Sequence, residues 1–173
     1  PELVTPLPER GEGRNHDLWI FGKTPRESVT ICIEAKADEP FGNFTVSGYR
    51  ETALKRRKNG IKTRAPERID ALLEMVSSDP SVWASVRYQL LTAICGTALQ
   101  AKADSSKLAV FLVYEFHTEL IDDEKLERNK MDFDQFLDVL GLAADAVGQL
   151  AGPVVVNGVE CLVGRVVRVV TER

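Results

Sequence analysis

The chain has 173 residues, of which 44% are hydrophobic and 28% charged, and its formal net charge is -4. These values suit a single domain with its own core. No apolar run approaches the roughly 20 residues that a membrane-spanning helix needs, so no membrane partner is expected. The three separated cysteines have no zinc-ligand or disulfide spacing, and no leader sequence opens the chain. Both features favour a cytoplasmic protein with free thiols.

Two strands are predicted near the start of the chain. Residues 1–15 contain several prolines and glycines, so we expect an irregular arm there. Strands follow at 17–22 and 28–36, and in the second one Val29, Ile31 and Ile33 alternate with polar residues at the period of two that is typical of a strand. Residues 37–63 predict a long basic loop or insertion, with a short helix near 49–58.

The rest of the chain alternates between helices and strands. Helices are expected at 66–76 and at 80–102, the second opened by Asp79 and Pro80. The apolar run 107–116 predicts a central strand covered on both faces. An acidic surface connection follows at 119–128, and Asp132 with Gln135 resembles a capping box that opens a helix ending at Leu140. Asn157 and Gly158 predict a β-hairpin over 154–163, with 164–170 extending its second strand. The whole chain, 1–173, is expected to form one α/β domain.

A candidate site lies at the end of the second strand. Glu34 and Lys36 are two residues apart, so they share one face of that strand. Asp17 is the first residue of the preceding predicted strand and supplies another carboxylate. Two carboxylates suit a hard divalent cation, and a nearby lysine can orient or deprotonate water. The other interpretation is a salt bridge at a strand end, with Asp17 capping a turn.

The order Asp17, then Glu34-Ala35-Lys36, resembles the PD-(D/E)xK nuclease superfamily. The segment Glu-Ala-Lys-Ala-Asp-Glu-Pro-Phe-Gly at 34–42 and Arg-Tyr-Gln-Leu-Leu at 87–91 are similar to an uncharacterised bacterial branch of that superfamily, and the likeness covers about 16–140. It implies a restriction-endonuclease-like mixed β-sheet flanked by helices, with the C-terminal helix and β-hairpin as additions.

The resemblance also implies a function, namely metal-dependent hydrolysis of phosphodiester bonds, in DNA rather than RNA. Asp17 and Glu34 would hold Mg²⁺ or Mn²⁺, Lys36 would serve the attacking water, and Gln89 would support the site. The alternative is a catalytically inactive module on the same fold that binds nucleic acid or protein.

A basic segment between 50 and 68 carries eight basic and two acidic residues. Phosphate binding by such a segment is one interpretation, and a solvated loop is the other. The residues expected to contact nucleic acid are Lys55, Arg56, Arg57, Lys58, Lys62 and Arg64. An exposed strand of the hairpin near 154–163 could also pair with a second copy of the chain, so a homodimer is left open.

Overall fold

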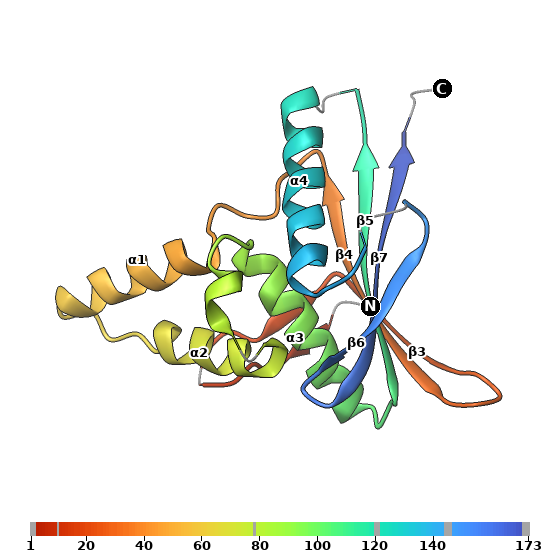
Figure 1. Ribbon diagram of the computed structural model, residues 1–173, viewed down its shortest axis with the longest axis horizontal. Helices are drawn as coiled ribbons and strands as arrows, with labels where there is room; N and C mark the ends of the chain where they lie inside the picture. The colour runs from red at the N-terminus through yellow and green to blue at the C-terminus, as the bar shows by residue number, and fades with distance from the viewer. Residues whose placement is uncertain (1–2, 10, 78, 120–121, 144–146, 171–173) are drawn as a thin grey trace.

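A computed structural model describes residues 3–9, 11–77, 79–119, 122–143 and 147–170. Its centre is a five-stranded mixed sheet with the order β3-β4-β5-β7-β6, in which β4, β5 and β7 are parallel and the two outer strands antiparallel (Figure 1). The strands are β3 (Leu18–Lys23), β4 (Ser28–Ala37), β5 (Leu108–His117), β6 (Leu150–Val156) and β7 (Val159–Val169). The expected α/β fold, a mixed sheet with helices, is confirmed.

The helices lie together on one face of this sheet (Figure 1). They are α1 (Val46–Lys58), α2 (Ala65–Val76), the short 3₁₀ helix η1 (Pro80–Trp83), α3 (Tyr88–Ala103) and α4 (Asp123–Val139). The core forms where α3 and α4 pack on the sheet. Phe136 of α4 packs edge-on against both Phe111 of β5 and Trp83, and these three side chains are fully buried.

The opposite face of the sheet has no helix packed on it within the described residues, so the expectation that β5 is covered on both faces is wrong for this part of the chain. The apolar side chains of that face, such as Ile31, Leu112 and Leu162, are half-buried by their neighbours, and Ile20 at the sheet edge is 42% exposed. A continuous apolar run therefore did not distinguish a strand covered on both faces from one covered on a single face.

Residues 1–15 were expected to be irregular, but the described part contains a two-stranded ribbon. Strand β1 (Leu3–Thr5) pairs with β2 (Arg14–His16) in antiparallel register. The buried His16 connects the ribbon to α3, because its Nε2 lies 3.1 Å from Thr5 Oγ1 and the Thr5 hydroxyl donates to Gln100 Oε1 at 2.8 Å. The prolines and glycines of residues 1–15 predicted an irregular arm, because they report only local backbone preference. They carry no information on the contact with α3.

The single helix expected at 80–102 is also wrong. Asp79 does cap a helical turn, since its carboxylate accepts from Ser81 N, but that turn is only η1. The chain then turns and is extended at Arg87, and the Val86 and Ala84 carbonyls accept hydrogen bonds from Val46 N and Ser47 N at the start of α1. These tertiary hydrogen bonds interrupt the helix, so α3 begins at Tyr88.

Helix α4 begins earlier than expected, within the segment interpreted as a surface connection. Asp122 is its N-cap and accepts from Lys125 N at 2.8 Å, and Asp123 and Glu124 in the first turn suit the positive end of the helix dipole. Asp132 is therefore not a cap. It lies in the middle of α4, where it accepts a 2.7 Å hydrogen bond from Arg87 Nε.

Other local signals are confirmed. Asn157 and Gly158 both have positive φ in the turn between β6 and β7, as a type I′ hairpin requires. Gly141, with φ of +71°, follows the end of α4. Helix α1 begins at Val46, three residues before the predicted start, because Thr45 caps it by accepting from Gly48 N.

The ribbon should make stability depend on pH. Burial, and then the nearby Arg14 charge, lower the pKa of His16 to about 4. Between about pH 4 and 6.5 the unfolded chain therefore binds more protons than the folded one, so stability falls as pH falls through this window. We expect wild type to lose roughly 2–3 kcal/mol more than His16→Gln between pH 7 and 4.5, measured by urea denaturation. Parallel losses in the two proteins would contradict this.

Candidate functional site

The candidate site occupies the place where β3 ends and β4 continues alone. Pairing of the two strands stops at Leu18 and Ile33, while β4 runs on to Ala37. A pocket of about 580 Å³ lies along this free edge. It is lined by Asp17, Glu34, Ala35, Lys36, Ala37, Glu39, Pro40, Gly42, Gln89 and Phe116. All four residues expected to form the site, namely Asp17, Glu34, Lys36 and Gln89, therefore line one pocket.

Asp17 is fixed against the free backbone edge of β4. Its Oδ2 atom accepts a hydrogen bond of 2.8 Å from Ala35 N. The N–H and C=O groups of one strand residue point to the same side, so the Ala35 carbonyl also faces the edge that β3 leaves uncovered. This edge therefore offers a carboxylate and a main-chain oxygen beside each other, both of which are ligands for Mg²⁺ or Mn²⁺.

The Glu34 carboxylate is the centre of the charged contacts. Its Oε1 atom lies 3.0 Å from Lys36 Nζ and accepts a 2.6 Å hydrogen bond from Gln89 Nε2. Its Oε2 atom accepts from Arg14 Nη2 of the ribbon. The Glu34 and Lys36 side chains are each 6% exposed, and that of Arg14 is 11% exposed. Two cations and an amide thus converge on one nearly buried carboxylate.

The environment of Lys36 lowers the pKa of its ammonium group below the ordinary value of a lysine. Burial lowers the pKa of its ammonium group, the nearby Glu39 carboxylate at 3.4 Å opposes that effect, and the Arg14 charge reinforces it. The ammonium also lies 5.9 Å from the centre of the Phe41 ring. A lysine with a lowered pKa has a larger neutral fraction at pH 7 than a solvated lysine has. Only the neutral amine can accept a proton.

Gln89 has one amide atom without a protein partner. Its Nε2 donates to Glu34, which fixes the orientation of the amide, and its Oε1 is buried with no hydrogen-bond partner among the described residues. A Cβ added at Gly42 would lie 3.8 Å from this oxygen. Gln89 and Gly42 both line the pocket, so Oε1 is available to accept a hydrogen bond from a water or ligand there.

Arg14 is the site residue that sequence reasoning missed. It lies in the segment interpreted as an irregular arm, and no spacing connects it with Glu34. A glycine on α3 permits its approach, because a Cβ at Gly96 would lie 2.8 Å from Arg14 Cγ. Gly96 within an otherwise buried helix was the available signal, since a helical glycine often marks a close approach.

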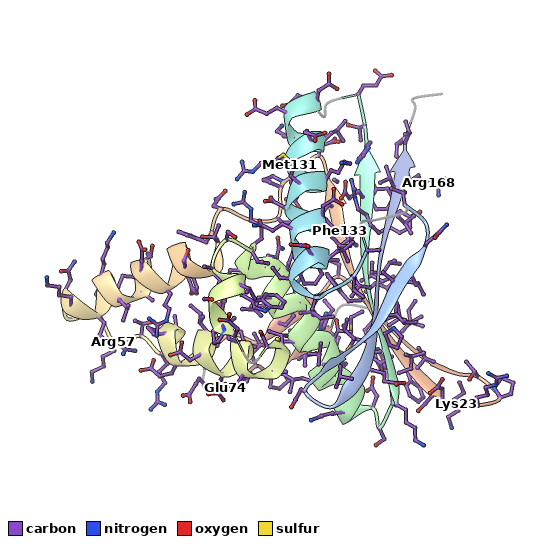
Figure 2. All side chains as sticks on the ribbon, viewed as in Figure 1. Lys23, Arg57, Glu74, Met131, Phe133 and Arg168 are labelled. Atoms are coloured by element: carbon purple, nitrogen blue, oxygen red, sulfur yellow. The ribbon has the colours of Figure 1, made fainter. Side chains whose placement is uncertain are left out.

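The six basic residues expected to contact nucleic acid are all exposed, at the C-terminal end of α1 and in the loop that follows. Helix α1 projects away from the sheet (Figure 1). Two of the six form ion pairs, Arg57 with Glu67 at 2.6 Å and Arg64 with Glu9 at 2.7 Å. The others have no ion pair within the described residues and remain open to solvent. Figure 2 shows Arg57 near the far end of α1, where it faces α2.

A second hollow, of about 590 Å³, lies on the outer face of α4 and is lined by Met131, Asp132, Asp134, Gln135, Asp138 and Leu142. It contains three carboxylates and no basic group, so it lacks the mixed charges that distinguish the β4 pocket.

No cluster of three or more His, Cys, Asp or Glu side chains is placed to hold a metal in the described part of the chain. A metal at the β4 edge would thus need the main-chain oxygen or substrate oxygens in addition to Asp17 and Glu34.

Other predictions concern the surroundings of the site. Arg87 pairs with Asp132 of α4 and is not among the residues that line the pocket. The three cysteines are buried and free. Strand β6 is an edge of the sheet, as pairing with a second copy would require, and a homodimer stays a prediction. None of the helices within the described ranges is long and apolar enough to span a membrane.

Comparisons with known proteins give a family and no activity. No curated protein and no solved structure matched the chain. One family model matches residues 1–169, which is nearly the whole chain. The chain therefore belongs to the family described as "Domain of unknown function (DUF6946)".

Proposed function

We propose that this protein is a metal-dependent nuclease that hydrolyses phosphodiester bonds, with DNA as the preferred substrate. The observation that carries the proposal is the meeting of Asp17, Glu34 and Lys36 in one pocket at the free edge of β4. The choice of DNA over RNA comes from the resemblance to the PD-(D/E)xK superfamily alone.

Each residue has a role that follows from its contacts. Asp17, Glu34 and the Ala35 carbonyl would hold Mg²⁺ or Mn²⁺, which when bound polarises a phosphate oxygen and acidifies water. Lys36, with its lowered pKa, would orient or deprotonate the attacking water. The unpartnered Gln89 Oε1 would accept a hydrogen bond from that water.

The basic end of α1 would bind the substrate backbone at a distance from the pocket. Gly42 lines the pocket, and α1 begins four residues later and is 13 residues long. At 1.5 Å per residue its basic end lies about 20 Å from its start. One strand of a double helix spans this length with roughly six nucleotides at 3.4 Å each. The proposal therefore includes a binding site of that size, formed by the unpaired basic residues.

A metal titration tests the proposal without knowledge of the substrate. We expect Mn²⁺ to bind wild type and to bind Asp17→Asn/Glu34→Gln at least about 100-fold more weakly, measured by calorimetry at pH 7. Asp138→Asn/Glu74→Gln removes the same two kinds of carboxylate from exposed positions on α4 and α2, and should leave the affinity unchanged. Equal Mn²⁺ binding by all three proteins would contradict the proposed metal site.

The Arg14 contact favours a second candidate, an inactive module on the same fold. A guanidinium that neutralises Glu34 can replace a metal charge permanently, as in a structural ion pair. This candidate predicts no Mn²⁺ binding by wild type and unchanged nucleic-acid binding by the Asp17→Asn/Glu34→Gln variant.

A further inference from the structure

Arg14 is a counter-ion of Glu34, the carboxylate that is proposed to bind the metal. Its guanidinium donates to Glu34 Oε2, while Lys36 and Gln89 share Oε1, so both oxygens of this carboxylate are engaged. A metal that binds Glu34 must displace at least one of these groups. Oε2 has Arg14 as its one partner in the described residues, so displacement of Arg14 exposes that whole oxygen.

The contact is built into the tertiary structure. The Arg14 side chain crosses α3 at Gly96, where any larger residue would meet Arg14 Cβ and Cγ at less than 3.0 Å. The neighbouring His16 holds the same strand through Thr5. Arg14 is thus directed at Glu34 by two neighbouring constraints, whereas the guanidinium itself is at the end of a flexible side chain.

We propose that Arg14 competes with the divalent cation for Glu34, and that a substrate phosphate group releases Glu34 by pairing with Arg14 instead. This inference rests on the proposed function and adds a coupling between phosphate and metal binding at the same site. A guanidinium binds phosphate through paired hydrogen bonds at least as well as it binds carboxylate. Because coupling is reciprocal, bound metal also strengthens phosphate binding.

Calorimetry with Mn²⁺ tests the competition directly. Arg14→Gln keeps the methylene groups that pass Gly96 and removes the charge, so we expect it to bind Mn²⁺ at least about 10-fold more tightly than wild type, the effect of one charged hydrogen bond. Arg87→Gln is the matched control, because Arg87 also pairs with a carboxylate of another element, Asp132 of α4, and is 14% exposed, but is not among the residues that line the pocket. Its Mn²⁺ affinity should equal that of wild type.

The coupling is tested with a phosphorothioate-linked thymidine hexanucleotide as the phosphate probe. We expect the probe to raise the Mn²⁺ affinity of wild type at least fivefold more than it raises that of Arg14→Gln. If Arg14→Gln does not fold, as judged by near-ultraviolet circular dichroism, the probe's effect on wild type alone decides, and an unchanged affinity overturns the inference.

The outcomes separate this inference from the proposed function. Equal Mn²⁺ affinities of Arg14→Gln and wild type, with weak binding by Asp17→Asn/Glu34→Gln, overturn the competition and leave the nuclease site intact. No Mn²⁺ binding by wild type or Arg14→Gln, with or without the probe, overturns both.

Discussion

Replacement of Lys36 by methionine should reduce phosphodiester cleavage by about 10²–10⁴-fold, the contribution of a positioned proton-transfer group. Methionine retains the apolar stem beside Phe41 and removes the ammonium that contacts Glu34 and Glu39. Because Lys36 is not a metal ligand in the proposed site and its removal takes a cation away from Glu34, Mn²⁺ should bind at least as tightly as it does to wild type. Reduced cleavage together with retained Mn²⁺ binding would show that Lys36 acts in the reaction and is not needed to hold the metal.

The measurement uses a pool of fluorescent single- and double-stranded oligonucleotides with Mn²⁺, at equal protein concentrations. Lys62→Met is the matched control, since Lys62 is exposed and belongs to the proposed backbone-binding segment. It should weaken substrate binding modestly and leave the maximal rate unchanged. Cleavage by Lys36→Met at the wild-type rate would refute the role assigned to this residue.

The second large effect is on stability and concerns a buried ion pair between β5 and β7. Arg165 Nε donates to Glu115 Oε1 at 2.8 Å, and the two side chains are 6% and 1% exposed. His117 Nε2 lies 2.9 Å from the other Glu115 oxygen. Glu115 is opposite Lys36 in the parallel register, so this pair stabilises the strand beside the candidate site.

Arg165→Met should lower the free energy of unfolding by about 3–5 kcal/mol, because it leaves the Glu115 carboxylate buried without its main counter-charge. The double variant Glu115→Leu/Arg165→Met should be more stable than Arg165→Met, since it removes both charges together. Urea denaturation at pH 7 measures both. The control Lys130→Met breaks an exposed pair with Asp134 and should cost at most about 1 kcal/mol. A loss below that for Arg165→Met would contradict the prediction.

Local sequence patterns predicted the strands of the five-stranded sheet and the turn of the hairpin. Alternation along 28–36 predicted β4 within one residue, and Asn157-Gly158 predicted the hairpin, because each signal depends only on neighbouring residues. The candidate residues Asp17, Glu34, Lys36 and Gln89 were also identified from their order along the chain, and they line one pocket. Their proposed chemistry stays a prediction until metal binding is measured.

Tertiary structure decided what these local patterns do not contain. The break before α3 depends on hydrogen bonds from the start of α1. The start of α4 depends on which of several acidic residues caps it, and Asp122 is the cap. Arg14 reaches Glu34 because a ribbon crosses α3 at Gly96, 82 positions further along the chain. Contacts across such separations depend on how the elements pack, and no local period or spacing records them. The sequence by itself therefore predicted the strands of the main sheet and four residues of the candidate site, and the packing decided the ribbon, the helix boundaries and which charge neutralises Glu34.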